Sequence, residues 1–168
     1  MVLNGISGIG KSSFMDILSG NFLESSSVWL IKNDDKSLFL ESIEGSRLIK
    51  NYIGYSPQSP FLFESTLLEN LTFKSNLSKN QKLVLNKEIK NYFISCGLLD
   101  RFENFSLDSL MNLTLDNFSG GEKKRIALIR NWLRDCPIEF LDEPTESLDF
   151  KNSKRVINTI RERSYKKI

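Results

Sequence analysis

The sequence predicts an α/β fold, with a mostly parallel sheet flanked by helices and a helical insertion near its middle. Three observations lead to this prediction. A glycine-rich loop at residues 5–10 runs directly into a helix, an apolar strand at residues 138–141 ends in two adjacent carboxylates, and residues 65–117 are dominated by helical patterns. We therefore divide the 168 residues into core parts at 1–64 and 118–168 and a helical subdomain at 65–117.

The N-terminal part shows strand, loop and helix signals in that order. Residues 1–4 predict the end of a strand, and Lys11 begins a helix whose apolar residues lie on one side. That helix ends at the Ser19-Gly20-Asn21 run, which is typical of a helix C-terminus. The next elements are a two-stranded hairpin, a short helical piece and a strand, at residues 28–31 and 37–40, 46–50 and 52–55.

The C-terminal part alternates between helices and a strand. Thr66 and Glu69 have the spacing of a capping box, in which two side chains close a helix N-terminus. Another helix begins after Ser119, carries apolar residues at steps of three and four, and is expected to end at Pro137. The remaining predictions are a helix, a strand, a loop and a final helix, at residues 82–93, 138–141, 142–149 and 152–163.

Residues 5–12 match the pattern G-x-x-x-x-G-K-[ST] in full. Glycines let backbone N–H groups wrap a phosphate without obstruction by Cβ atoms, and the helix that follows directs its positive end at the anion. We expect Lys11 to reach the β and γ phosphates of ATP and the Ser12 hydroxyl to bind Mg²⁺. The alternative is a flexible glycine turn ahead of a helix. The predicted nucleotide-binding residues are Gly5, Ile6, Ser7, Gly8, Ile9, Gly10, Lys11, Ser12 and Ser13.

The strand at residues 138–141 ends in Asp142 and Glu143. A buried parallel strand presents such acids at its carboxyl edge. We expect Asp142 to hold Mg²⁺ through water and Glu143 to orient or deprotonate the attacking water. The alternative is a solvated acidic turn before Pro144. Glu139, within the apolar run, should reach solvent or a cationic partner.

The Ser119-Gly120-Gly121-Glu122 turn opens a basic helix, and Leu-Asp-Glu-Pro-Thr follows further on. Together they resemble the signature motif and Walker B strand of the ABC ATPase family. The resemblance implies that this turn contacts the γ-phosphate of ATP held by a second subunit, the same physics of an anion at a helix end. The spacing of Ser119 and Glu122 also predicts a capping box, and the two readings are compatible.

Two further residues match the family. Gln58 resembles the Q-loop glutamine that touches Mg²⁺ and senses the transporter, and Asp149 in Ser-Leu-Asp resembles the D-loop aspartate. The predicted catalytic residues are therefore Glu143, Lys11 and Gln58. The predicted Mg²⁺-binding residues are Ser12, Gln58 and Asp142.

Residues 59–71 look like the stretch of ABC exporters that meets coupling helices of the membrane domain. The resemblance implies an ATP-hydrolysing domain that works as a homo- or heterodimer with a second nucleotide-binding domain. It also implies a transmembrane partner or fused membrane domain, and a place at the cytoplasmic face of the membrane. The glycine-containing loop that exporters carry before the signature is not recognisable at residues 109–116.

Several departures from the family pattern stand out. Glu122 occupies a position usually held by Gln, and Glu146 one usually held by Ser. The family's adenine-stacking aromatic precedes the phosphate loop, and its switch histidine follows the last helix, whereas this sequence has no histidine. We therefore expect a chain truncated at both ends, with weak nucleotide binding by itself.

Bulk properties narrow the alternatives. The net charge of +2 lacks the basic excess of a dedicated nucleic-acid binder, so no nucleic-acid partner is expected. Cys96 and Cys136 are too far apart for a C-x-x-C motif and suggest reduced thiols. No apolar run reaches the roughly 18 residues of a membrane helix. A soluble ABC ATPase of chromosome or repair type needs a long coiled coil, and residues 58–119 show no sustained heptads. An inactive nucleotide-binding remnant is the other alternative.

Overall fold

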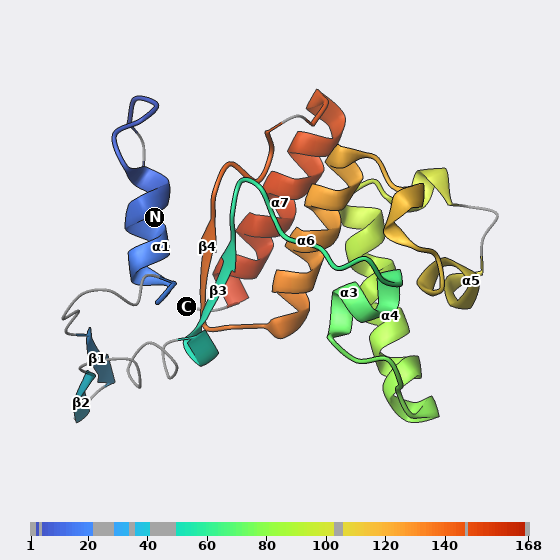
Figure 1. Cartoon of the computed structure of the whole chain (residues 1–168), viewed down its shortest axis with the longest axis horizontal. Coiled ribbons are helices and arrows are strands. Elements are labelled where there is room, and N and C mark those ends of the chain that lie inside the picture. The colour runs from blue at the N-terminus through green and yellow to red at the C-terminus, as the bar shows by residue number, and fades with distance from the viewer. Residues whose placement is uncertain are drawn as a thin grey trace. The chain divides into compact units, whose positions relative to one another are not determined.

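The structure is a computed structural model that describes residues 3, 5–21, 29–33, 36–40, 50–102, 106–146 and 148–166 (Figure 1). The chain forms two compact units. The first comprises Met1–Tyr55 and Cys136–Phe140, and the second comprises Ser56–Asp135 and Leu141–Ile168. The predicted helical segment, residues 65–117, lies within the second unit, and its independence as a subdomain remains a prediction.

The first unit begins with the glycine loop and helix α1, Lys11–Leu18, which starts where the sequence predicted. Its end at Ser19 is also confirmed, because the Ser19 N–H donates to the Met15 carbonyl at 2.8 Å. Strands β1, Trp29–Asn33, and β2, Lys36–Leu40, pair antiparallel and confirm the hairpin. The predicted strand at 1–4 and helical piece at 46–50 lie almost wholly outside the described residues.

Strands β3, Ile53–Ser56, and β4, Ile138–Leu141, form a hydrogen-bonded pair that runs in one direction (Figure 1). The range of β4 matches the prediction, and β3 lies one residue further along than predicted. Past the end of the pair, the Asp142 N–H donates to the Ser56 carbonyl at 2.9 Å. Glu139 is only partly buried, as an acid within a strand should be. The pairing of β3 and β4 therefore places Asp142 beside the C-terminal end of β3.

Helices build the core of the second unit. The longer ones are α3, Leu67–Thr72, α4, Lys79–Ser95, α6, Gly120–Arg134, and α7, Phe150–Lys166. Short turns of helix join them: η1, Leu99–Arg101, α5, Leu107–Met111, and η2, Leu115–Asn117. Helix α6 packs against α3 and α4, and α4 packs against α7. The most deeply buried large side chains include Trp132, Phe93, Leu67, Ile89, Ile126 and Ile129. Their burial anchors α6, which carries the signature turn at its start.

Capping explains where these helices begin and end. Complete capping boxes close the starts of α3, α4 and α6, through Thr66, Ser78 and Ser119 respectively. Helix α6 ends at Arg134, earlier than the predicted stop at Pro137, because Asp135 adopts left-handed backbone with φ of 48°. Throughout the described ranges, every helix is too short or too polar to cross a bilayer.

Candidate nucleotide-binding and catalytic site

The predicted phosphate loop lies in the first unit and folds around its own lysine. The Lys11 ammonium donates hydrogen bonds to the carbonyls of Gly5, at 2.8 Å, and Ile6, at 2.9 Å. Gly8 and Gly10 have φ of 81° and 95°, which residues with a Cβ rarely adopt. The loop is therefore a closed turn that holds the Lys11 ammonium against its own backbone.

The outer side of the loop is open at two of its glycines. At Gly8 and Gly10, no atom lies within 4 Å of the place that a Cβ would occupy. Ser12 and Ser13 are exposed in the first turn of α1, and that turn contains no acidic residue. The start of α1 thus offers free N–H groups, hydroxyls and a positive dipole end, which together suit phosphate.

The predicted catalytic residues of the second unit lie together. Gln58 follows β3, and Glu143 follows β4, so the paired strands bring both to one sheet edge. There the Gln58 amide nitrogen donates to the Glu143 carboxylate at 2.8 Å. Glu143 is exposed and has φ of 47°, an uncommon backbone state for a residue other than glycine. Asp142 is only 7% exposed.

Sequence reasoning missed a charged pair that extends this contact. The Gln58 amide nitrogen also donates to Glu146, at 3.2 Å, and the other Glu146 oxygen lies 2.6 Å from the Lys124 ammonium. The hydrogen bond from Lys124 lowers the pKa of Glu146 below its usual value. An amide nitrogen shared by two carboxylates has its orientation fixed, with its oxygen turned away from both. The one signal in the sequence was Glu146 itself, where the family usually has Ser.

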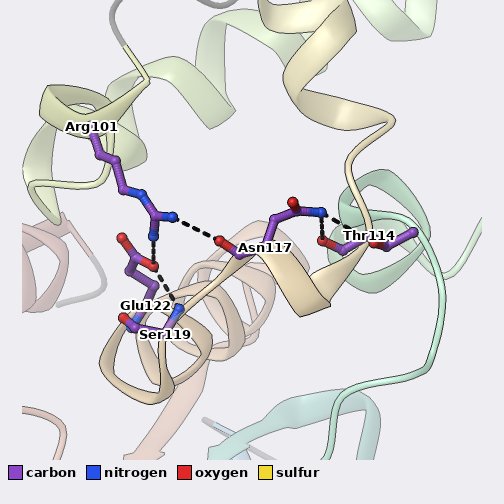
Figure 2. Close-up of polar contacts among 5 residues, drawn as sticks. All are labelled: Arg101, Thr114, Asn117, Ser119 and Glu122. Carbon is purple, nitrogen blue, oxygen red and sulfur yellow. Dashed lines mark hydrogen bonds and ion pairs between the residues drawn. The ribbon is translucent and has the colours of Figure 1, made fainter.

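The signature turn begins helix α6, and Figure 2 shows its polar contacts. The Ser119 hydroxyl accepts from the Glu122 N–H at 3.4 Å, and the Glu122 carboxylate accepts from the Ser119 N–H at 2.7 Å. Ser119 and Gly120 are exposed, whereas Glu122 is buried. This confirms the predicted capping box and leaves the start of α6 open to solvent.

Arg101, from η1, forms an ion pair with Glu122 and also donates to the Asn117 carbonyl at 2.9 Å (Figure 2). Burial alone raises the pKa of Glu122. Hydrogen bonds from Arg101 and Ser119, with the Arg101 charge, outweigh that effect and hold the pKa below its usual value. Glu122 is therefore a carboxylate at neutral pH. The sequence carried no local sign of this partner.

Asp149 caps the N-terminus of α7. Its carboxylate accepts from the Asn152 N–H at 2.9 Å and from the Asn152 side chain at 2.6 Å. The backbone hydrogen bond from Asn152 is the main cause of a lowered pKa at Asp149. Its part in a nucleotide site stays a prediction, like the roles of the other predicted site residues.

The predicted Mg²⁺ ligands are too few to bind a metal ion without the nucleotide. Among the described residues, no group of three or more His, Cys, Asp or Glu side chains could hold a metal ion. The predicted set is one hydroxyl, one amide and one carboxylate, from Ser12, Gln58 and Asp142. That donor set suits Mg²⁺, which takes oxygen ligands and fills most positions with substrate phosphates and water.

A lysine-bearing glycine loop, strand-end carboxylates and a capped Ser-Gly-Gly helix define a P-loop ATPase of the α/β class. The family model described as ABC transporter matches residues 1–146. The chain therefore belongs to the ABC transporter family, within which it corresponds to the ATP-binding domain, as the sequence predicted.

Two kinds of curated relative illustrate the match. The transport/processing ATP-binding protein ComA of Streptococcus pneumoniae strain R6 is 32% identical over 158 residues, which cover 93% of this chain and 21% of ComA. The putative hemin import ATP-binding protein HrtA of Staphylococcus aureus strain Newman is 30% identical over 166 residues, 96% of this chain and 69% of HrtA. The chain thus spans about a fifth of the length of ComA.

Solved structures confirm the fold. A bacterial Atm1-family ABC exporter with ATP bound has a TM-score of 0.66 and 21% identity, over 94% of this chain and 26% of that one. A dimeric ATP-binding cassette in a post-hydrolysis state, with ADP and Pi bound, has a TM-score of 0.68 and 22% identity, over 94% of this chain and 66% of that one. The predicted α/β P-loop fold is therefore right.

Proposed function

We propose that this domain binds Mg-ATP and hydrolyses it to drive export through a membrane partner. The contact between Gln58 and Glu143, 2.8 Å from amide nitrogen to carboxylate oxygen, carries the proposal. It joins the residue expected to sense the metal and the transporter with the residue expected to handle the attacking water. An ordinary acidic turn after a strand would need no such partner.

Each residue group has one task in the proposed reaction. The loop N–H groups and Lys11 bind the β and γ phosphates, so the Lys11 ammonium exchanges its own loop carbonyls for phosphate oxygens. Glu143 orients a water molecule in line with the γ-phosphorus and accepts its proton, while the water oxygen bonds to that phosphorus. The bond from the γ-phosphorus to the bridging oxygen of the β-phosphate breaks, and ADP and phosphate leave. Ser12, Gln58 and Asp142 would hold Mg²⁺, which would neutralise phosphate charge. Positioning supplies most of the catalysis in phosphoryl transfer.

A second nucleotide-binding domain completes the proposed site. The open start of α6, with Ser119 and Gly120 exposed, is suited to meet the γ-phosphate held by that second domain. The dimer would be head to tail, because in that arrangement the signature turn of each domain contacts the nucleotide bound by the other. The two domains could be identical or different.

An exposed aromatic surface supports a membrane partner. Phe61, Phe63 and Phe73 stack edge to face, with ring centroids 5.3 and 5.8 Å apart. Arg130 lies over the Phe73 ring and donates to the Phe61 carbonyl at 2.7 Å. Beside them, a groove of about 540 Å³ is lined by Phe73 and Leu77, which lie between α3 and α4, by Val84 of α4, and by other residues of α3, α4 and α6. Apolar surface of this kind is typical of an interface. We place the domain at the cytoplasmic face of the membrane, bound there by this surface.

The phosphate-loop assignment is tested by Lys11→Ala in the intact protein. We expect ATP turnover to fall at least about a hundredfold, since removing one preorganised donor commonly costs that much. Phosphate release and binding of a fluorescent ATP analogue measure the two effects separately. Lys90→Ala, which removes an exposed lysine on α4, is the control and should keep both. Unchanged turnover and affinity in Lys11→Ala would refute the assignment.

A further inference from the structure

Glu122 places a negative charge in the first turn of α6. Its side chain is 9% exposed, and its carboxylate accepts from the Ser119 N–H at 2.7 Å. A carboxylate there favours the helix itself, because it offsets the positive end of the helix dipole. The same offset weakens the attraction of that helix end for a phosphate. The sequence therefore combines a signature turn with a charge that opposes its proposed ligand.

Arg101 forms an ion pair with this carboxylate. Its guanidinium bridges two groups of the turn, the Glu122 carboxylate and the Asn117 carbonyl (Figure 2). Asn117 in turn donates to the Thr114 carbonyl at 3.1 Å, so the turn is held from both sides. The Arg101 side chain is 52% exposed and lies over the Phe102 ring at 5.2 Å. A guanidinium is always charged and suits such a two-pronged contact.

We propose that Arg101 is a positioning residue for the signature turn, where it neutralises Glu122 so that the start of α6 can accept the γ-phosphate of a nucleotide bound by the second domain. This inference rests on the proposed function. In this proposal Arg101 acts on the turn through its ion pair with Glu122. It follows that the need for Arg101 depends on the charge at position 122.

That dependence separates the proposal from a merely structural role. If Arg101 served only to fix the Asn117 carbonyl, removing the Glu122 charge would not make Arg101 dispensable. If Arg101 serves to neutralise Glu122, the loss of both charges together should be tolerated better than the loss of Arg101 alone. A double-mutant cycle measures this difference.

The experiment compares wild type, Arg101→Met, Glu122→Gln and the double variant in the intact protein, through the ATP dependence of phosphate release. We expect Arg101→Met to lower kcat/KM about five- to tenfold, the size of a charge effect at a helix end. The double variant should recover to the level of Glu122→Gln alone, and Arg101→Lys should retain most of the wild-type value.

A double variant as slow as Arg101→Met would overturn the proposal, as would an Arg101→Met protein equal to wild type. Nucleotide binding to the phosphate loop alone, measured with ADP, should be unchanged in Arg101→Met; a matching loss there would also overturn it. Lys11→Ala in the same assay keeps the two proposals apart. If Lys11→Ala retains turnover, the proposed function fails; if only the Arg101 variants behave as wild type, the inference about Arg101 fails.

Discussion

At the scale of residues, three carboxylates at or near predicted site positions of the second unit each accept a hydrogen bond or ion pair from another side chain. Gln58 holds Glu143, Lys124 holds Glu146, and Arg101 holds Glu122. Glu146 and Glu122 are two positions at which this sequence departs from the motifs expected of its family. Each departure thus comes with a cation on another element, which is the pattern expected when a charge is accommodated by its surroundings. Motif matching alone identifies the departures but not their partners, since the partners lie far along the chain.

Cys96 provides a prediction about pH. Burial raises the pKa of this thiol to about 12, although the nearby Arg125 charge opposes the rise. The folded protein therefore keeps the thiol neutral, while the unfolded chain ionises it near its ordinary pKa of about 8.5. Ionisation favours the unfolded state, so stability should fall as pH rises above that value, by at most about 1.4 kcal/mol per pH unit for one group.

Urea unfolding of the folded protein between pH 7 and pH 10 measures this effect. Other groups titrate in the same range, so Cys96→Ala is the matched control. We expect the free energy of unfolding to fall more steeply with pH in wild type than in Cys96→Ala. Parallel pH profiles for the two proteins would show that Cys96 is not held neutral by the fold.

At the scale of elements, local signals predicted most of the starts and fewer of the ends. The Thr66 and Ser119 capping boxes and the β4 strand were predicted from short patterns that contain their own physics. The Ser78 box and the full range of α4 were missed, although Ser78 and Gln81 have the same spacing. The prediction that Pro137 ends α6 was wrong: the helix ends at Arg134, because Asp135 adopts left-handed backbone, a state that sequence favours only weakly outside glycine.

Gly97 provides a prediction for the end of α4. With φ of 65°, it lets the Leu98 N–H reach the Phe93 carbonyl at 2.8 Å, which closes the helix. A Cβ there would overlap the Asn152 side chain and lie 2.7 Å from the Arg155 guanidinium, both on α7. We expect Gly97→Ala to cost about 1–2 kcal/mol, mainly from left-handed strain, because the ends of the Asn152 and Arg155 side chains can move away from the added Cβ.

Thermal or urea unfolding gives the cost. Gly120→Ala is the comparison, because nothing lies within 4 Å of a Cβ at Gly120 and alanine is favourable in a helix. Its stability should equal or exceed that of wild type. A Gly97→Ala protein as stable as Gly120→Ala would mean that α4 and α7 do not meet at Gly97 as described.

At the scale of the whole molecule, the sequence predicted the α/β class and the family because both rest on contiguous motifs. The glycine loop, the acids after β4 and the Ser-Gly-Gly turn each carry their chemistry within a few residues. What tertiary packing creates could not be predicted in this way. The Lys124 contact to Glu146 and the Arg101 contact to Glu122 arise only when helices and loops distant in sequence come together. The motifs alone therefore predict neither contact.

Glu143→Gln in the intact protein tests the central claim most directly. The amide keeps the shape of Glu143 but cannot accept the proton of the attacking water, so turnover should fall at least about a hundredfold while Mg-ATP still binds. Size-exclusion chromatography should show a long-lived dimer with ATP and none with ADP. Glu162→Gln, an exposed position on α7, should behave as wild type. A Glu143→Gln protein that keeps its turnover and accumulates no ATP-bound dimer would contradict the account.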